Sequence, residues 1–339
     1  MNFKSDNTAP AAPEILAALS ACNEGAAASY GEDAWTARVN ARLSALFEAD
    51  VEVFLVATGT AANALALASM TPPWGSILCH REAHIETDEA GAPEFFTAGA
   101  KLVLIDGPHA KIAPDGLEEA LTRNRRGVHS VHPGVVSISN ATERGAVYAP
   151  DEVAALAAIA HREGIGLHMD GARFANAVAH LGCAPRALTK DAGVDVLSFG
   201  ATKNGALGVE AIVVFDRARA RDIPQRRKRA GHLFSKHRYL AAQMLAYLEN
   251  DLWLVNARRA NGLAQAIADA AGAWVSAPVQ SNHVFIRPGA ATLAALRAAG
   301  AEFYEWGAPG SGEARLVVSY SQPEEEVGRL CEALRRLRA

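Results

Sequence analysis

The chain has 339 residues, of which 50% are hydrophobic, 21% charged and only 6% aromatic. This composition is typical of a globular protein with one large and one smaller domain, and it excludes a disordered chain. The 33 basic and 37 acidic residues give a net charge of −4, which argues against a nucleic-acid-binding surface. No apolar run approaches the roughly 18–20 residues of a membrane-spanning helix, and the 4 cysteines form no CxxC pair. We therefore expect a soluble cytoplasmic protein without a zinc site, a disulfide framework or a membrane partner.

Short β-rich runs alternate with helical stretches over the first two thirds of the chain. The predicted strands are Val51–Val56, Ser76–Cys79, Lys101–Ile105, Val135–Ser139, Ile165–Met169, Val194–Phe199 and Ala211–Phe215. The predicted helices are Thr60–Met70, Gly116–Arg123, Pro150–Arg162 and Asn176–Leu181. Apolar strands that alternate with helices indicate an α/β fold with a mainly parallel sheet. Because ligands bind beyond the carboxyl ends of such strands, the residues after each strand are the candidate site residues.

The pattern changes after about Asn250, where a smaller α+β domain is predicted. Its helices are Asn256–Ala271, Ala291–Ala299 and Glu324–Leu337, and its strands are Ser281–Ile286 and Arg315–Ser319. The first 40 residues contain no clear strand. We therefore divide the chain into an arm or part of the small domain (1–40), a large domain (41–250) and a small domain (251–339).

The first motif, Ala57–Asn63, follows a predicted strand and opens a predicted helix. A glycine flanked by Thr58 and Thr60 at a helix N-terminus offers free N–H groups and two hydroxyls, which suit a phosphate. An ordinary helix cap by either threonine is the alternative. The loop lacks the GxGxxG and GxxxxGK[ST] patterns, which argues against dinucleotide and P-loop sites.

Two more predicted strands end in charged residues. Asp170, with Arg173 nearby, follows Ile165–Met169 and indicates either a site for a cationic ligand group or a capped helix with an ion pair. Lys203 follows Val194–Phe199 amid small residues, where burial would lower its pKa and make it a nucleophile, unless it is a surface lysine. Together, a phosphate loop, an aspartate and a lysine, each after a strand, predict a pyridoxal phosphate site. There Asp170 keeps the pyridine nitrogen protonated, and Lys203 forms the Schiff base.

His80 and His84 stand at a spacing that can hold a metal. The pattern is neither HExxH nor HxxEH and no third ligand is placed, so we expect no metal. A histidine after a strand is better placed to stack on a cofactor ring or to move a proton, and a solvated loop histidine is the alternative. The basic run Arg226–Arg229, with Lys236 beyond it, is typical of a solvated helix face.

The ordered motifs resemble those of a known family, the low-specificity L-threonine aldolases. The resemblance rests on Tyr30–Asp33, Thr58–Thr60, His84, His168–Arg173 and Lys203, and extends from Ser5 to Arg315. It implies the aspartate aminotransferase fold, the fold type I of pyridoxal phosphate enzymes, with a seven-stranded sheet in the large domain. It also implies a lyase that cleaves L-threonine or L-allo-threonine to glycine and acetaldehyde, with broad β-hydroxy-α-amino acid specificity. The proteobacterial branch is the most similar and also resembles L-phenylserine aldolase, which remains an alternative, as do another fold-type-I lyase and a transaminase.

The same resemblance implies roles for individual residues. Thr58, Gly59 and Thr60 would hold the phosphate, His84 would stack on the ring and act as a base, and the substrate carboxylate would be held by Ser5, Arg173 and Arg315. Tyr30 and His129 would approach the site, with Tyr30 in the neighbouring subunit, and Arg229 or Lys236 would reach the phosphate across the interface. The resemblance therefore implies a homo-oligomer, expected to be a tetramer, whose partner is otherwise only a small amino-acid substrate.

Overall fold

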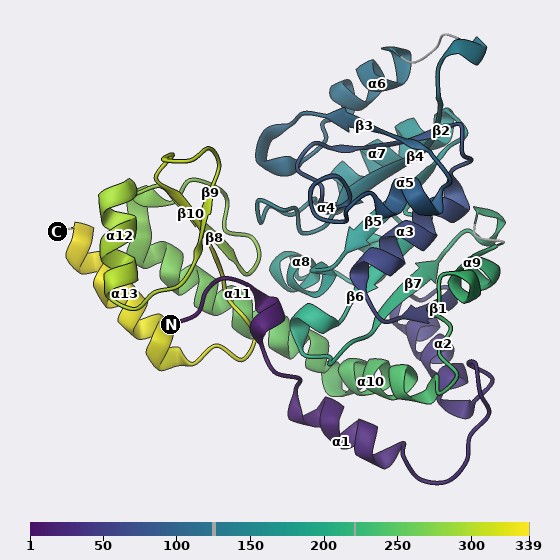
Figure 1. The fold of residues 1–339 in the computed structure, drawn as a ribbon, viewed down its shortest axis with the longest axis horizontal. Helices are drawn as coiled ribbons and strands as arrows, with labels where there is room; N and C mark the ends of the chain where they lie inside the picture. The colour runs from purple at the N-terminus through teal and green to yellow at the C-terminus, as the bar shows by residue number, and fades with distance from the viewer. Residues whose placement is uncertain (124–126, 220–221, 339) are drawn as a thin grey trace.

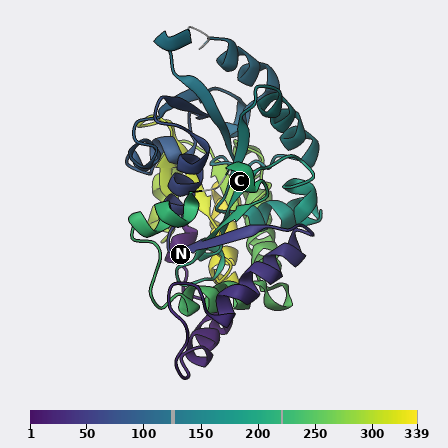
Figure 2. The ribbon, with the colours of Figure 1, turned by 90° about the vertical axis from the view of Figure 1, so that its right-hand side faces the viewer.

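The computed structural model describes residues 1–123, 127–219 and 222–338. Two sheets lie side by side, and the long helix α11 (Leu252–Ala271) runs from one domain into the other (Figure 1). In the view turned by 90°, the small domain lies behind the large one (Figure 2). No helix within these three described ranges is both long and apolar enough to span a membrane.

The large domain contains a seven-stranded sheet with the order β1-β7-β6-β5-β4-β2-β3. The strands are β1 (Glu52–Val56), β2 (Gly75–His80), β3 (Lys101–Ile105), β4 (His132–Ser139), β5 (Gly166–Gly171), β6 (Val196–Gly200) and β7 (Glu210–Val214). Only β7 runs antiparallel to its neighbours β1 and β6 among these strands. The predicted α/β fold with a mainly parallel sheet is thus confirmed.

Helices cover both faces of this sheet because the side chains on both faces of its strands are apolar. Leu55, Leu197 and Val213 belong to the largest apolar cluster, with residues of α2, α7, α8 and α10. Their neighbours Phe54 and Val196 point the other way and pack with α3 and α9. The helices of this domain are α1 (Pro13–Ala21), α2 (Ala34–Leu46), α3 (Gly59–Met70), α4 (His84–Thr87), α5 (Ala92–Phe96), α6 (Pro114–Arg123), α7 (Pro150–Arg162), α8 (Phe174–Leu181), α9 (Ile223–Arg229) and α10 (Arg238–Leu248).

The small domain has a three-stranded antiparallel sheet with the order β8-β10-β9. Its elements are β8 (His283–Ile286), α12 (Ala290–Ala298), β9 (Tyr304–Trp306), β10 (Glu313–Val317) and α13 (Glu324–Arg338). The N-terminal residues join it, because the N–H of Phe3 donates to the Glu302 carbonyl (2.8 Å) and the Phe3 side chain lies in the small core. Helix α1 instead packs against α10. The first 40 residues therefore contact both domains, and we keep the division into 1–40, 41–250 and 251–339 as a proposal.

Candidate active site

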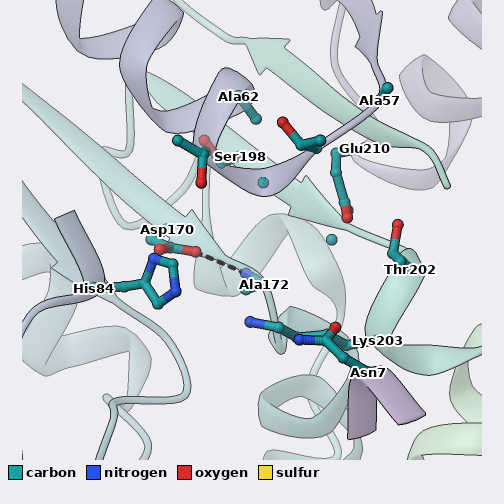
Figure 3. Close-up of a pocket in the computed structure, with 14 residues that line it drawn as sticks. Asn7, Ala57, Ala62, His84, Asp170, Ala172, Ser198, Thr202, Lys203 and Glu210 are labelled. Carbon is teal, nitrogen blue, oxygen red and sulfur yellow. Dashed lines mark hydrogen bonds between the residues drawn. The ribbon is translucent and has the colours of Figure 1, made fainter. Parts of the chain in front are cut away.

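The predicted phosphate loop and most predicted catalytic residues meet in one cavity of about 260 Å³ at the carboxyl ends of the strands (Figure 3). A second hollow of about 50 Å³ shares much of its wall. The residues brought together are Thr58, Gly59 and Thr60 at the start of α3, His84 in α4, Asp170 in β5, Arg173 before α8, and Lys203 after β6. Their chemical roles stay predictions, and the geometry below bears on each.

The start of α3 forms the wall of the cavity that suits an anion. Thr58 caps this helix, because its hydroxyl accepts a hydrogen bond from the Ala61 N–H (3.1 Å). The N–H groups of Gly59 and Thr60 belong to the first turn, where helix geometry leaves donors without intrahelical partners and the helix dipole favours negative charge. A Cβ built at Gly59 would meet no atom of the described residues within 4 Å. The helix therefore presents an open anion-binding turn to the cavity.

Asp170 is a buried carboxylate that the site keeps ionised. Its Oδ1 accepts the Ala172 N–H (2.9 Å), and its Oδ2 accepts a hydrogen bond from the Asn63 amide (2.9 Å). Burial alone would raise the pKa of Asp170, but the nearby His84 and Lys203, together with these hydrogen bonds, hold it below its usual value. A fixed negative charge here suits a cationic ring nitrogen.

Lys203 lies in a tight turn after β6, in the 3₁₀ segment η5 (Thr202–Asn204). The turn is anchored because the Asn204 amide donates to the Tyr247 hydroxyl (2.8 Å) and to the Trp253 carbonyl (2.7 Å). Burial lowers the pKa of the Lys203 ammonium, and the positive charge of Arg173 lowers it further. An amine that loses its proton more readily is a better nucleophile.

His84 opens α4 and is oriented by a buried carboxylate. Its Nδ1–H donates to Oε1 of Glu89 (2.8 Å), so the proton of the neutral ring resides on Nδ1. Nε2 is then the ring nitrogen that can accept a proton. The backbone N–H of His84 donates to Glu143 (3.0 Å). The hydrogen bond to Glu89 raises the pKa of His84 despite the opposing effect of burial, and the charge of Asp170 adds to this. The ring can therefore accept a proton in the cavity.

Arg173 is already paired with a carboxylate of the N-terminal segment. Its Nε and Nη2 donate to the two oxygens of Asp6 (2.8 and 2.9 Å), and Asn282 also donates to Asp6 (2.9 Å). Both N–H groups of Nη1 and the second N–H of Nη2 are left for a substrate. The bond to Asp6 fixes the guanidinium, and the role of Arg173 in holding the substrate carboxylate stays a prediction.

Whereas Arg173 is paired with Asp6, Arg315 has a buried donor without a partner among the described residues. Its guanidinium stacks over the Trp306 ring at 4.6 Å from the ring centroid, and its buried Nε has no hydrogen-bond partner in the described part of the chain. Burial and the like charge of Arg173 lower its pKa. A buried donor without a partner is costly, so this guanidinium is ready for an anionic group of a ligand.

Comparisons with known proteins agree with this geometry. The family model described as beta-eliminating lyase matches residues 2–288. The low specificity L-threonine aldolases of Pseudomonas sp. (strain NCIMB 10558) and Pseudomonas aeruginosa are each 44% identical over 337 residues, covering 98% of this chain and 96% of each relative. A solved structure of Leishmania major threonine aldolase has a TM-score of 0.93 and 28% identity, and covers 100% of this chain and 99% of that chain.

The chain belongs to the low specificity L-threonine aldolases, within the beta-eliminating lyases. It is a lyase of a pyridoxal phosphate-dependent family, as the motifs predicted. Aspartate aminotransferase of Rhodobacter sphaeroides, at 19% identity and a TM-score of 0.73 over 99% of this chain and 92% of that chain, shares the fold. The predicted fold type is therefore confirmed.

The cavity of this aldolase-family chain fits that cofactor. The open turn of α3 is a cradle for the phosphate, and the ionised Asp170, which suits a protonated pyridine nitrogen, lines the same cavity. Lys203 lines the same cavity with a lowered pKa. The donor set thus matches a phosphate, a ring nitrogen and an aldehyde on one molecule.

Tyr30, Arg229 and Lys236, which were predicted to act across the interface, lie outside the cavity of their own chain. Tyr30 is 47% exposed, and its backbone N–H donates to the Ser235 carbonyl (2.9 Å). The ammonium of Lys228 lies 4.4 Å from the centroid of the Tyr30 ring. Arg229 instead lines a separate hollow with Phe95 and Phe96, and Lys236 is exposed. The structure therefore groups Lys228, which the sequence analysis did not single out for the phosphate, with Tyr30.

His129 and Ser5 do not line the cavity of their own chain either. His129 is exposed in the segment η3 (Gly127–His129), just before β4, whereas the cavity lies at the other end of that strand. Ser5 caps η1 (Asp6–Thr8) by accepting the Asn7 N–H (3.2 Å), and Asn7 lines the cavity. Ser5 is thus adjacent to the site, and His129 is distant from it in the same chain.

Both ring nitrogens of His80 form hydrogen bonds with the backbone, which indicates a structural role. Its ring bonds the Gly107 carbonyl (3.1 Å) and accepts the Glu82 N–H (3.0 Å), and burial lowers its pKa. Across residues 1–123, 127–219 and 222–338, no group of three or more His, Cys, Asp or Glu side chains could hold a metal.

The sequence analysis missed Asp6, Asn63, Glu89 and Glu210, all of which line the site or bond to residues that do. Asn63 had a usable signal, because it follows Gly59 by one helical turn and so faces the same side of α3. For Asp6, Glu89 and Glu210, local spacing in the sequence provides no such signal.

Proposed function

We propose that this chain cleaves L-threonine and L-allo-threonine to glycine and acetaldehyde, with broad specificity for β-hydroxy-α-amino acids. The observation that carries the proposal is a cavity in which an oriented base, His84, accompanies Lys203 and Asp170. Arg315 lies close enough to Arg173, which lines the adjoining hollow, for their charges to interact, and its buried Nε has no partner in the described part of the chain. The names of the relatives at 44% identity support the same reaction.

When bound, pyridoxal phosphate supplies an electron-withdrawing ring that accepts the electrons of the broken Cα–Cβ bond. Lys203 anchors it through its amine, and Asp170 keeps its ring nitrogen protonated by a fixed negative charge. The start of α3 binds the phosphate.

Arg315 holds the α-carboxylate of the substrate and thereby sets the orientation of the Cα–Cβ bond, with Nη1 of Arg173 as a second donor. Nε2 of His84, directly or through a water, takes the proton of the β-hydroxyl group as that bond breaks. Such a base typically contributes 10²–10⁴-fold. A histidine whose Nδ1 is already bonded to Glu89 is prepared for this step.

We also propose a cytoplasmic homotetramer in which Tyr30 and Lys228 complete the site of a neighbouring subunit. Both are exposed, in contact with each other and outside the cavity of their own chain. His129, whose proposed role is also in the active site, would reach it only from another subunit, since it lies at the far end of β4.

The reaction and the lysine can be tested together. The purified enzyme should release glycine and acetaldehyde from L-threonine without an oxo-acid acceptor, and borohydride should fix a pyridoxyl group on the peptide that contains Lys203. Lys203→Ala should abolish both, whereas Lys190→Ala, which changes an exposed lysine, should retain both. Trapping on Lys190 or Lys236 would show the assignment to be wrong.

A panel of L-threonine, L-allo-threonine and the phenylserine isomers separates the candidate substrates. Higher kcat/KM for phenylserine with release of benzaldehyde would favour the alternative, an L-phenylserine aldolase. A requirement for an oxo acid would instead indicate a transaminase.

A further inference from the structure

One buried amide connects two carboxylates of the active site. Nδ2 of Asn63 donates to Oε1 of Glu89 (2.8 Å) and to Oδ2 of Asp170 (2.9 Å). Glu89 in turn accepts the hydrogen bond of His84, through the same oxygen, Oε1. Asn63, Glu89 and Asp170 are all at least 93% buried. A continuous chain of hydrogen bonds therefore joins His84 to Asp170.

The chemistry of the partners fixes the orientation of this amide. Both partners are carboxylates and only accept, so the NH₂ group of Asn63 must face them. Its Oδ1 is then left buried, with no partner in the described ranges of the chain. The amide therefore directs both of its N–H groups to the two buried carboxylates and leaves its own oxygen without a partner, which marks the two carboxylates as the groups it serves.

The amide also separates two like charges. Glu89 and Asp170 approach the same NH₂ group, and two carboxylates that share a site normally drive one of them to take up a proton. Each N–H of Asn63 stabilises the ionised form of one carboxylate. The titratable and charged groups that share a hollow with this pair are His84 from α4, Glu143 after β4, Arg173 before α8 and Lys203 from η5.

We propose that Asn63 is a positioning residue that keeps Glu89 and Asp170 ionised together, and so couples the base His84 to the carboxylate of the ring nitrogen. The inference deepens the proposed function and rests on it only for the identity of the reaction. Asn63 lies in the first turns of α3, so the phosphate cradle, the base and the ring partner share one support.

The test replaces the amide with an apolar group and measures His84. In Asn63→Leu, one carboxylate of the pair should take up a proton. Whichever one it is, His84 loses nearby negative charge, and its pKa should fall. Histidine NMR titration of the full-length, cofactor-loaded enzyme, with His84→Asn for assignment, measures this directly. We also expect kcat to fall by at least about tenfold, through the loss of base strength and orientation.

Two comparisons make the result specific. Asn176→Leu removes another buried amide, which donates to Asn261 in α11 (2.8 Å), and should leave the pKa of His84 unchanged. Asn63→Gln keeps the donor group and should retain more of the His84 pKa than Asn63→Leu, which a merely structural role would not produce.

A double-variant cycle covers the case in which Asn63→Leu folds poorly. Asn63→Ser and Glu89→Gln should each lower the pKa of His84, and their effects should be less than additive, because Glu89→Gln removes the pair of like charges on which Asn63 acts. An unchanged pKa in Asn63→Leu or Asn63→Ser, or fully additive shifts, would overturn the proposal. Failure of the parent enzyme to cleave threonine would overturn the proposed function but leave the titration result standing.

Discussion

Two buried glutamates, Glu210 and Glu313, have pKa values that are shifted in opposite directions. Glu210 in β7 lines the cavity and accepts the Ala201 N–H (2.7 Å). Burial raises its pKa from 4.5 to about 7, against hydrogen bonds from Thr202 and Ala201 that favour the charged form. Between these two pH values the folded chain keeps a proton that the unfolded chain releases, so the free energy of unfolding falls as pH rises. A pKa rise of this size corresponds to roughly 3 kcal/mol.

We expect Glu210→Gln to remove this loss of stability. The cofactor-free variant should match the parent at pH 5, where Glu210 is protonated, and unfold at a higher urea concentration than the parent at pH 8. Urea midpoints at both pH values measure the effect. Equal midpoints at pH 8 would mean that Glu210 ionises there without cost.

Glu313 provides the matched control. Burial would raise its pKa, but hydrogen bonds from Ser276 and Arg287, with the charge of Arg144, hold it below its usual value. Its contribution to stability is therefore present above the unfolded pKa and is lost as pH falls through the folded pKa. Glu313→Gln should lower the urea midpoint at pH 8, the opposite of Glu210→Gln.

Residues at the end of a strand, shortly after it, or at the start of the next helix could be predicted from the sequence. Asp170, Lys203 and Thr58 all have this position, and the structure brings them together. The bond between Asp6 and Arg173 joins residues 167 positions apart, and the bond between Asn63 and Asp170 spans 107 positions. No local spacing encodes such pairs, because the tertiary fold alone creates them.

At the scale of single elements, the apolar pattern located all seven strands of the large sheet, with boundaries within three residues of those observed. Lys101–Ile105 and Pro150–Arg162 match β3 and α7, since a strand or helix with a fully or half-buried face has a clear periodicity. The strand β9 was missed because its three residues are mostly exposed and lie at a sheet edge. An alternation of apolar and polar residues cannot be recognised over so short a strand.

The N-cap of helix α3, Thr58, contributes to both stability and binding. Thr58→Ala removes the cap bond to Ala61 and should lower the free energy of unfolding by about 1 kcal/mol. It should also weaken phosphate binding, because the first turn loses its fixed geometry and a hydroxyl. The measurements are urea unfolding and the rise of Tm with added inorganic phosphate. Thr58→Ser keeps the hydroxyl and should retain most of both, and an equal loss in Thr58→Ser would rule out the cap as the cause.

At the scale of the whole molecule, the site depends on contacts between domains. Asp6 follows an N-terminal stretch that joins the small core, yet it bonds Arg173 of the large domain and Asn282 of the small one. Arg315 belongs to β10 in the small sheet and lies close enough to Arg173 for their charges to interact. The carboxylate side of the site therefore forms only when both domains and the N-terminal segment come together.

The proposed subunit interface leads to a test with hybrid enzymes. Lys203→Ala damages a site from within its own chain, whereas Lys228→Ala should damage the site of the neighbour. A hybrid dimer of the two chains then contains one site with both defects and one intact site. Co-expression with two affinity tags isolates the hybrids, which should recover about half the activity of the parent, because two-fold symmetry gives each chain one complete pair of contributions.

The matched control combines Lys203→Ala with Asp170→Asn. Both residues line the cavity of their own chain, so every site of that hybrid has one defect and should stay inactive. Recovery in the first hybrid and not in the second requires that Lys228 acts across the interface. Arg229→Ala, which changes a residue of the separate hollow beside Phe95, should itself remain active. If Arg229→Ala is inactive and complements Lys203→Ala while Lys228→Ala is fully active, then Arg229 reaches the phosphate and the pairing of Lys228 with Tyr30 is only a surface contact.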